Sequence, residues 1–354
     1  MLCKKIFIDF ERMRYPHTGL YHFCSQLGKA LLKQIEPSSE HLYLYLPRQE
    51  QQIFKSCLFT PIHHNTFHKF YMPSKNQFDL WHSIYQGTNY LPNRIKPPLI
   101  LTIHDLNFMH DYRLSASKKK EELRKLQVKI DQASYLTVIS EFTLKEVKTH
   151  LTIGNIPVQV IHNGCNFSSQ TVITIPSYIP PANFLFTIGT VVPKKNFHVL
   201  PAILTKNNLF LVIAGVNHDI DYKRKIEAEA KKWKVQDRVI FTGSISEEEK
   251  SWYYKHCTAF VFPSLAEGFG LPVIEAMYFG KPVFLSSLAS LPEIGGNVAN
   301  YFLNFDPQHM QEVLEKGLHE NKSTTRSVEI CQRACSFSWE KAAQKYRNIY
   351  QTFF

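Results

Sequence analysis

The sequence predicts an α/β protein whose parallel sheets form two domains. Short apolar runs recur from one end of the chain to the other, and several are apolar continuously rather than alternately, as strands covered on both faces require. Longer segments of mixed polarity separate most of these runs, which is typical of strands that alternate with helices. The chain has 354 residues, and single hydrophobic cores stop growing near ~250–300 residues, so we expect two domains.

Six runs of strand length and composition lie in the first part of the chain. They are KKIFIDF (4–10), HLYLYLP (41–47), DLWHSIY (79–85), PPLILTIHD (97–105), SYLTVIS (134–140) and VQVIHN (158–163). We expect them to form the sheet of a first domain, residues 1–166. The carboxyl ends of its strands should carry the ligand-binding groups, as in other parallel sheets.

Five similar runs lie in the second part of the chain. They are NFLFTIG (183–189), NLFLVIAG (208–215), RVIFTG (238–243), TAFVFPS (258–264) and KPVFLSS (281–287). We expect a second domain over residues 183–335. Residues 167–182 contain three prolines and no helical period, which predicts an interdomain linker.

The end of the chain, residues 336–354, is expected to form one amphipathic helix. Trp339, Ala343, Tyr346 and Tyr350 recur at intervals of three and four residues. This spacing places all four side chains on one apolar stripe of a helix.

The charge of the chain favours anionic partners. Lys and Arg total 41 against 30 Asp and Glu, a formal net charge of +11. A nucleotide, a nucleic acid and an anionic membrane surface all fit this excess. Nucleic acid is the least favoured, because no aromatic platform or recognition-helix motif accompanies the basic residues.

Cysteine usage and hydropathy favour a cytoplasmic protein. The seven cysteines are scattered, with no CxxC pair, which fits a reducing compartment. The N-terminus has no signal-peptide pattern, and no uncharged apolar run approaches 18 residues. We therefore expect no signal peptide and no membrane span.

The most informative string is FPSLAEGFGLPVIEAMYFGKPV, residues 262–283. It follows a buried strand and opens a helix, with Pro272 suited to the first helical position. The glycines on either side of Phe269 let backbone N–H groups approach a ligand, and the helix start favours an anion such as pyrophosphate.

Two carboxylates flank this loop. Glu267 and Glu275 have seven residues between them, so one precedes the helix and the other lies in its first turns. Carboxylates accept hydrogen bonds from hydroxyls, so the pair suits two polyols on either side of a phosphate, as in a nucleotide-sugar. The alternative is structural, because the helix dipole stabilises a nearby acid without any ligand.

These residues resemble the signature E-G-F-G-L-P-x-x-E of family 4 of the retaining glycosyltransferases, which have the GT-B fold. Weaker similarity covers nearly the whole chain. The similar strings are Thr18-Gly19-Leu20, TIHDLNF (102–108), ASYLTVISEFT (133–143), VIHNGCN (160–166), IGTVVPKKN (188–196), IAG (213–215) and RVIFTGSIS (238–246). The resemblance implies two Rossmann-like domains facing across a cleft, an acceptor-side first domain, a nucleotide-sugar-binding second domain and a C-terminal helix that crosses back to the first.

The resemblance also implies roles for residues of the second domain. Lys195 would contact the donor diphosphate, with Lys194 beside it where the family often has Arg. Glu267 would hold sugar hydroxyls and Glu275 the ribose hydroxyls. The loop between these two acids would bind the donor through its backbone, and its residues are Gly268, Phe269, Gly270 and Leu271.

Two residues of the first domain complete the expected site. His104 would lie close to the donor sugar and phosphate, with Asp105 orienting its ring. Gly19 would let the N-terminal loop approach the acceptor or the donor phosphates. Tyr21 stands where a second glycine is frequent, so the sequence departs from the family's form at this loop.

The implied activity is transfer of a hexose with retention, with mannose from GDP-mannose as the first choice of donor. The acceptor would be a glycan or lipid-linked sugar in cell-surface polysaccharide or lipopolysaccharide synthesis. No metal and no cofactor is expected, since no DxD-like pair stands out. The alternatives are a UDP-sugar donor, and an epimerase or phosphorylase of the same fold.

Residues 114–130 carry six basic residues beside Leu123, Leu126 and Ile130. Two interpretations remain open. The segment is either a basic amphipathic helix that lies on anionic lipid at the inner face of the plasma membrane, or a helix whose apolar stripe packs on the sheet.

Overall fold

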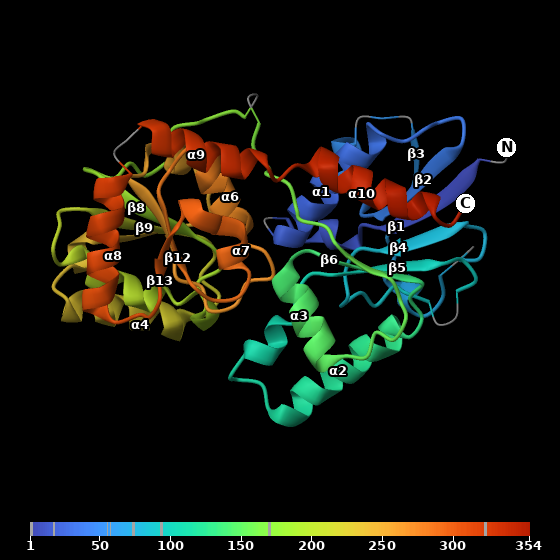
Figure 1. Cartoon of the computed structure of the whole chain (residues 1–354), viewed down its shortest axis with the longest axis horizontal. Coiled ribbons are helices and arrows are strands. Elements are labelled where there is room, and N and C mark those ends of the chain that lie inside the picture. The colour runs from blue at the N-terminus through green and yellow to red at the C-terminus, as the bar shows by residue number, and fades with distance from the viewer. Residues whose placement is uncertain are drawn as a thin grey trace. The chain divides into compact units, whose positions relative to one another are not determined.

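The computed structural model describes residues 3–354 apart from residues 17, 55, 57, 73–74, 93–94, 169–170 and 322–323. The chain forms two compact units (Figure 1). The first comprises Met1–Asn166 with Ser338–Phe354, and the second comprises Phe167–Phe337. The domain boundaries inferred from the sequence stay a prediction, and the two units are treated separately below.

The first unit is built on a seven-stranded sheet in which every pair is parallel. The strand order is β3-β2-β1-β4-β5-β6-β7. Its strands are β1 (Lys4–Asp9), β2 (Glu40–Leu46), β3 (Phe59–His63), β4 (Leu80–Ser83), β5 (Leu99–Ile103), β6 (Tyr135–Val138) and β7 (Val158–Val160). Its helices are α1 (Gly19–Leu32), α2 (Ala116–Ile130), α3 (Glu141–His150) and α10 (Trp339–Gln351), with the 3-10 helices η1 (Glu11–Arg14), η2 (Arg48–Ile53), η3 (Thr66–Lys69) and η4 (Asn107–His110).

Helices on both faces explain why the strands of this sheet are apolar without interruption. All five residues of β5 and all four of β4 are buried. On one face Phe7 stacks on Trp81 with ring centroids 3.7 Å apart, and Phe78 packs against both rings. Burying continuous apolar strands requires cover on both sides, which the α/β alternation supplies.

The second unit contains a six-stranded parallel sheet in the order β10-β9-β8-β11-β12-β13. Its strands are β8 (Phe184–Ile188), β9 (Phe210–Ala214), β10 (Val239–Gly243), β11 (Ala259–Phe262), β12 (Val283–Ser286) and β13 (Asn300–Phe302). Its helices are α4 (Ile220–Lys232), α5 (Glu247–His256), α6 (Leu271–Tyr278), α7 (Leu291–Gly295), α8 (Pro307–Glu320) and α9 (Thr324–Cys335), with η5 (Pro193–Lys195), η6 (Phe197–Leu204), η7 (Gln236–Arg238) and η8 (Gly296–Val298).

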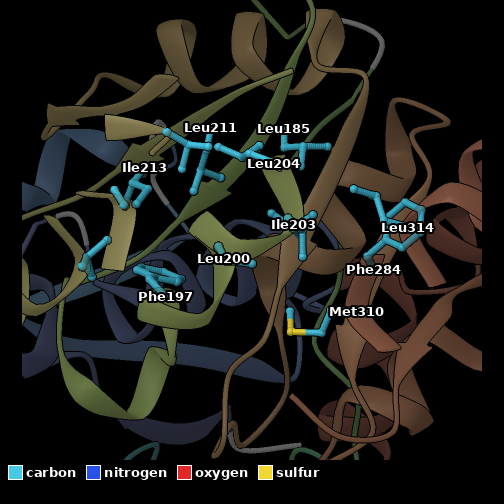
Figure 2. Close-up of a cluster of buried hydrophobic side chains, with 14 of the residues drawn as sticks. Leu185, Phe197, Leu200, Ile203, Leu204, Leu211, Ile213, Phe284, Met310 and Leu314 are labelled. Atoms are coloured by element: carbon cyan, nitrogen blue, oxygen red, sulfur yellow. The ribbon is translucent and has the colours of Figure 1, made fainter. Parts of the chain in front are cut away.

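The core of the second unit joins the sheet to η6 and α8 (Figure 2). Leu185 from β8 and Leu211 from β9 meet Leu200 from η6 in one buried cluster. Met310 and Leu314, one helical turn apart on α8, belong to the same cluster. This packing fixes the ends of the central strands, where the loops of the candidate site begin.

The last helix returns to the first unit, as predicted. Trp339, Ala343, Tyr346 and Tyr350 are all buried, and α10 packs against α1 (Figure 1). The Tyr350 hydroxyl lies 2.7 Å from Nδ1 of His82 on β4, and neither side chain is exposed. The helix is therefore joined to the sheet by a buried polar contact as well as by its apolar stripe.

Each of the eleven predicted runs contains a strand, but the sequence did not predict β3 or β13. Both are edge strands, β3 beside β2 and β13 beside β12. β3 contains Pro61, and β13 is three residues long. Edge strands tolerate proline and can be short, so neither has the apolar run that marks a central strand.

The residues predicted as a linker lie along the second unit. No described residue of 167–182 belongs to a helix or strand. The Ser177 N–H donates to Glu249, and the Tyr253 hydroxyl donates to the Tyr178 carbonyl at 2.6 Å. These contacts place the segment against α5.

Candidate functional site

The candidate site begins at the loop between β11 and α6. Gly270 caps α6 with φ of 113°, a conformation that favours glycine. Pro272 is the second residue of the helix, where its missing N–H leaves no intrahelical bond unmade. The Val273 N–H donates to the Gly270 carbonyl at 2.9 Å, which tightens the first turn. The loop therefore has the local conformation that its glycines and proline predict.

A second loop brings a lysine to the acid of this motif. Lys195 ends η5, which follows β8, and its Nζ lies 2.5 Å from Oε1 of Glu267. Ser264 Oγ donates to the same oxygen at 2.6 Å. The Lys195 ammonium also lies 4.8 Å from the centre of the Phe262 ring. The structure thus brings together two of the residues that the sequence singled out.

This pairing affects the charge of Glu267. Burial alone would raise the pKa of its carboxyl, but the charges of Lys195 and Lys194 and the hydrogen bonds hold that pKa below its usual value. The carboxylate is therefore ionised at neutral pH. It can accept hydrogen bonds from ligand hydroxyls, and Lys195 can face an anion.

Two backbone features hold the loops together. The Lys194 carbonyl accepts from the Leu265 N–H at 2.8 Å and lies 3.2 Å from Ser264 Oγ, while the Lys194 side chain is exposed. Gly189 has φ of 149°, and a Cβ there would lie 3.1 Å from Lys195 Cε. Glycine is therefore needed at this position to let the lysine lie along the strand end.

Glu275 lies on the inner side of α6 and is 3% exposed. Its Oε1 lies 3.2 Å from Nζ of Lys250, and its Oε2 accepts from the Tyr254 hydroxyl at 3.1 Å. Lys250 is also buried, and its Nζ lies 2.7 Å from Oε2 of Glu247. Burial opposes the charge of Lys250, but Glu275 and Glu247 raise its pKa above the usual value.

Sequence reasoning missed Lys250 and Tyr254. They are four residues apart on α5, a spacing that puts two side chains on one helix face. That spacing was visible in the sequence. Nothing in the sequence, however, indicated that this face meets α6.

In the first unit, His104 follows β5 and is buried. Its ring Nε2 lies 2.7 Å from the Ile84 carbonyl, and its backbone N–H donates to Gln86 Oε1. The Phe23 ring packs edge-on against the imidazole, with ring centroids 4.6 Å apart. Burial lowers the pKa of His104 to about 4, so the ring is neutral at pH 7. A carbonyl only accepts, so Nε2 carries the hydrogen and Nδ1 is the acceptor.

Asp105 and Gly19 are the other residues of the first unit to which the sequence assigned a role. Oδ1 of Asp105 accepts from the Asn107 N–H at 2.9 Å, and the expectation that Asp105 orients His104 stays a prediction. Gly19 is exposed and begins α1, with no atom within 4 Å of the position that a Cβ would take. Thr18 caps the helix by accepting from the Tyr21 N–H, and the Tyr21 hydroxyl donates to Glu50.

The predicted site residues therefore belong to two groups. Gly19 and His104 lie in the first unit. All the predicted donor-binding residues lie in the second unit, and they are Lys194, Lys195, Glu267, Gly268, Phe269, Gly270, Leu271 and Glu275. The role of each residue stays a prediction. In the part of the chain that the structure describes, no cluster of three or more His, Cys, Asp or Glu side chains has metal-binding geometry.

The basic segment 114–130 forms α2, and part of its charge is engaged. Lys129 donates to the Gln86 and Thr88 carbonyls, and burial lowers its pKa to about 8. Lys118 and Lys125 pair with acids of the same helix. Leu126 and Ile130 are buried, so the apolar stripe packs on the first unit. Among the described residues, no helix has the length and apolar character needed to cross a bilayer.

Two family models match the chain. The model described as Glycosyltransferase Family 4 matches residues 17–169, and the model described as Glycosyl transferases group 1 matches residues 178–331. Together they span both units. They confirm the family resemblance inferred from the sequence.

Similar curated proteins include bacterial mannosyltransferases. The O-antigen chain mannosyltransferase B of Escherichia coli is 26% identical over 297 residues, 76% of this chain and 74% of that protein. The O-antigen chain mannosyltransferase RfbU of Salmonella typhimurium is 24% identical, over 61% of this chain and 59% of that protein. The serotype-specific mannosyltransferase WbdA of E. coli is 31% identical over 47% of this chain, which spans 21% of that longer protein.

Solved structures share the fold. Sucrose-phosphate synthase from Thermosynechococcus elongatus has a TM-score of 0.77 at 18% identity, covering 99% of both chains. Anabaena Alr3699/HepE in complex with UDP and glucose has a TM-score of 0.71 at 16% identity, covering 99% of this chain and all of that one. These likenesses confirm the predicted fold of two parallel-sheet domains with a returning C-terminal helix.

Proposed function

Because the chain belongs to family 4 of the glycosyltransferases, we propose that it transfers a hexose from a nucleotide-sugar to a glycan or lipid-linked acceptor with retention of anomeric configuration. The observation that carries this proposal is the contact of Lys195 with Glu267 beside the start of α6. It places a cation for a diphosphate and an ionised carboxylate for sugar hydroxyls in one small region. A helix start beside them adds partial positive charge.

The second unit is proposed to bind the donor. Lys195 and the backbone of residues 268–271 would face the diphosphate, with the exposed Lys194 adding charge. Glu267 would accept hydrogen bonds from the sugar hydroxyls and Glu275 from the ribose. Lys250 and Tyr254 each contact one oxygen of Glu275, which holds the carboxylate in place.

In the proposed reaction the acceptor oxygen attacks the anomeric carbon on the face from which the nucleoside diphosphate leaves. The bond from the anomeric carbon to the phosphate oxygen breaks, and the acceptor proton passes to that leaving oxygen. Negative charge develops on the diphosphate, and Lys195 with the start of α6 would stabilise it. His104, neutral and with Nδ1 as acceptor, would take a hydrogen bond from a sugar hydroxyl rather than supply charge.

Mannose from GDP-mannose is the proposed donor. The curated relatives named above are mannosyltransferases, and two of them are named for O-antigen chains. An acceptor in cell-surface polysaccharide or lipopolysaccharide synthesis fits these names. A UDP-hexose is the second candidate, because the Anabaena neighbour of similar fold is in complex with UDP and glucose.

The test is a transfer assay with GDP-mannose, UDP-glucose and UDP-galactose as donors and a mannose-terminated oligosaccharide as acceptor. NMR of the product gives the anomeric configuration of the new bond. The proposal predicts transfer from one donor with the α configuration of that donor kept. A product with inverted configuration would refute the retaining mechanism, and donor-dependent epimerisation or phosphorolysis without transfer would refute the transferase.

A further inference from the structure

Arg12 lies directly after the carboxyl end of β1, in η1. Its guanidinium packs over two tyrosine rings, 4.5 Å from the centre of Tyr15 and 4.7 Å from the centre of Tyr85. Two aromatic contacts hold the planar group in a defined place. The sequence reasoning assigned Arg12 no role.

The described part of the chain gives this guanidinium few close partners. Its Nε is buried and has no hydrogen-bond partner among the described residues. Its ion pair with Oε2 of Glu11 is long, at 4.0 Å, and the other oxygen of Glu11 lies closer to Arg14, at 3.3 Å. The charge of Arg12 also acts on the buried carboxyl of Asp9.

Arg14, in the same 3-10 helix, has more partners among the described residues. Its NH1 contacts Glu11, donates to the Tyr90 hydroxyl at 3.4 Å and lies 3.4 Å from Nε2 of His64. These contacts join Arg14 to other residues of the first unit. The two arginines differ in their partners, although they are two residues apart.

Tyr85 links Arg12 to the predicted site residue His104. Tyr85, under the guanidinium, also makes an edge contact with the His104 ring, with centroids 6.4 Å apart. The charge of Arg12 contributes to the low pKa of His104, after burial. The Arg12 side chain is 27% exposed, so its outer face can meet a ligand while Nε lies inside.

We propose that Arg12 binds a phosphate group of a ligand at the carboxyl end of the first unit's sheet. The exposed part of the guanidinium can donate to an oxyanion while the two tyrosine rings hold the group in place. The donor fork of arginine matches phosphate oxygens in pairs, and its rigid stacking reduces the entropy lost on binding. The carboxyl ends of parallel strands are the usual place for such ligands.

Two substrates of a glycosyltransferase can supply that phosphate, and to this extent the inference rests on the proposed function. One source is the diphosphate of the nucleotide-sugar. The other is an acceptor that carries a phosphate, such as a lipid phosphate. The chemistry at Arg12 is the same in both cases.

The test uses the full chain and compares Arg12→Gln and Arg12→Lys with wild type. Arg224→Gln removes one positive charge from an exposed position of the second unit and is the matched control. Calorimetry measures binding of pyrophosphate, GDP, UDP and farnesyl phosphate at fixed salt, and circular dichroism confirms that each variant is folded. We expect at least one of these probes to bind at least tenfold more weakly to Arg12→Gln. Arg12→Lys should be intermediate, and the control should match wild type.

The four probes distinguish the two sources of the phosphate. If Arg12→Gln loses affinity only for pyrophosphate and the nucleotides, Arg12 binds the donor. If it loses affinity only for farnesyl phosphate, Arg12 binds the acceptor. If folded Arg12→Gln binds every probe as wild type does, the inference is wrong. If no nucleotide binds to wild type but pyrophosphate or farnesyl phosphate binding depends on Arg12, the phosphate site stands and the proposed function fails.

Discussion

Nζ of Lys195 lies 2.5 Å from Oε1 of Glu267, although 72 residues separate the two in the sequence. Both side chains are nearly buried, with 12% and 13% of their surfaces exposed. The two groups therefore neutralise each other in the absence of a ligand. A diphosphate that draws Lys195 toward itself would release Glu267 for the sugar, so donor binding and sugar recognition should be coupled through this pair.

Replacing Lys195 tests the role of the cation. Lys195→Met should lower kcat by about 10²–10³-fold, the usual effect of removing one group aimed at developing negative charge. The change also leaves Glu267 without its cation, and breaking a buried pair costs about 3–5 kcal/mol of stability. Lys194→Met, at an exposed side chain, should lose much less activity. Steady-state kinetics and urea denaturation measure both effects, and equal losses in the two variants would contradict the assignment.

Replacing Lys250 tests how Glu275 is held. Lys250→Met removes the cation from one oxygen of Glu275. It should weaken nucleoside diphosphate binding by about tenfold, which corresponds to about 1.4 kcal/mol of binding free energy. The loss should be smaller for the 2′,3′-dideoxy nucleotide, because that ligand lacks the hydroxyls that Glu275 would bind. Calorimetric titration of both nucleotides measures this difference.

The control for Lys250→Met is Lys255→Met, an exposed lysine on the same helix. It removes the same charge without touching Glu275 and should bind both nucleotides as wild type does. Identical losses for the ribose and dideoxy nucleotides in Lys250→Met would mean that Lys250 acts on the fold rather than on ribose recognition.

Gly189→Ala tests the close approach of Lys195 to the strand end. The new Cβ would lie 3.1 Å from Lys195 Cε, so the lysine would have to shift by a few tenths of an ångström. Gly243→Ala is the matched change, because Gly243 also has positive φ, at 72°, but has no atom within 4 Å of the new Cβ. Both variants should lose about 1 kcal/mol of stability to backbone strain. Only Gly189→Ala should also lose diphosphate affinity, as measured by calorimetry, and unchanged affinity there would refute the steric argument.

The buried histidines predict how stability depends on pH. Burial lowers the pKa of His82 to about 3, whereas an unfolded histidine titrates near 6.5. Between these values the unfolded chain binds more protons, so the contribution of His82 is complete above about pH 6.5 and is lost as pH falls toward 3. Between these two pH values the free energy of unfolding changes by about 1.4 kcal/mol per pH unit for one group.

Asp9 acts in the opposite direction. Burial raises the pKa of its carboxyl to about 6, so its contribution is complete below about pH 3.9 and is lost as pH rises through 6. Replacing His82 removes one of these two opposing contributions. Urea denaturation from pH 7.5 to 4.5 should show a shallower decline for His82→Gln than for wild type, and His319→Gln, at an exposed side chain, should keep the wild-type slope. A wild-type slope in folded His82→Gln would contradict this account.

The central strands and the donor motif were predictable from sequence because each leaves a local signature. β5 and β11 are continuous apolar runs, and the string around Glu267 carries glycines, a proline and a second acid at fixed spacing. The edge strand β3 lacked such a signature because Pro61 interrupts it.

The remaining site residues depend on tertiary contacts. Lys250 reaches Glu275 across 25 residues, and Arg12 meets Tyr85 across a sheet of parallel strands. Nothing in the sequence indicates which residues either side chain meets. His104 was placed by a short string, but its neutral state follows from the burial that the fold imposes.

The most direct test of the central claim is a calorimetric titration of GDP, UDP, ADP and dTDP into wild type and Glu275→Ala in the presence of EDTA. The account predicts that one diphosphate binds wild type and that Glu275→Ala binds it at least tenfold more weakly. If no diphosphate binds wild type while an RNA or DNA oligonucleotide does, the donor site assigned here is wrong, and the net charge of +11 would have to be explained by nucleic acid.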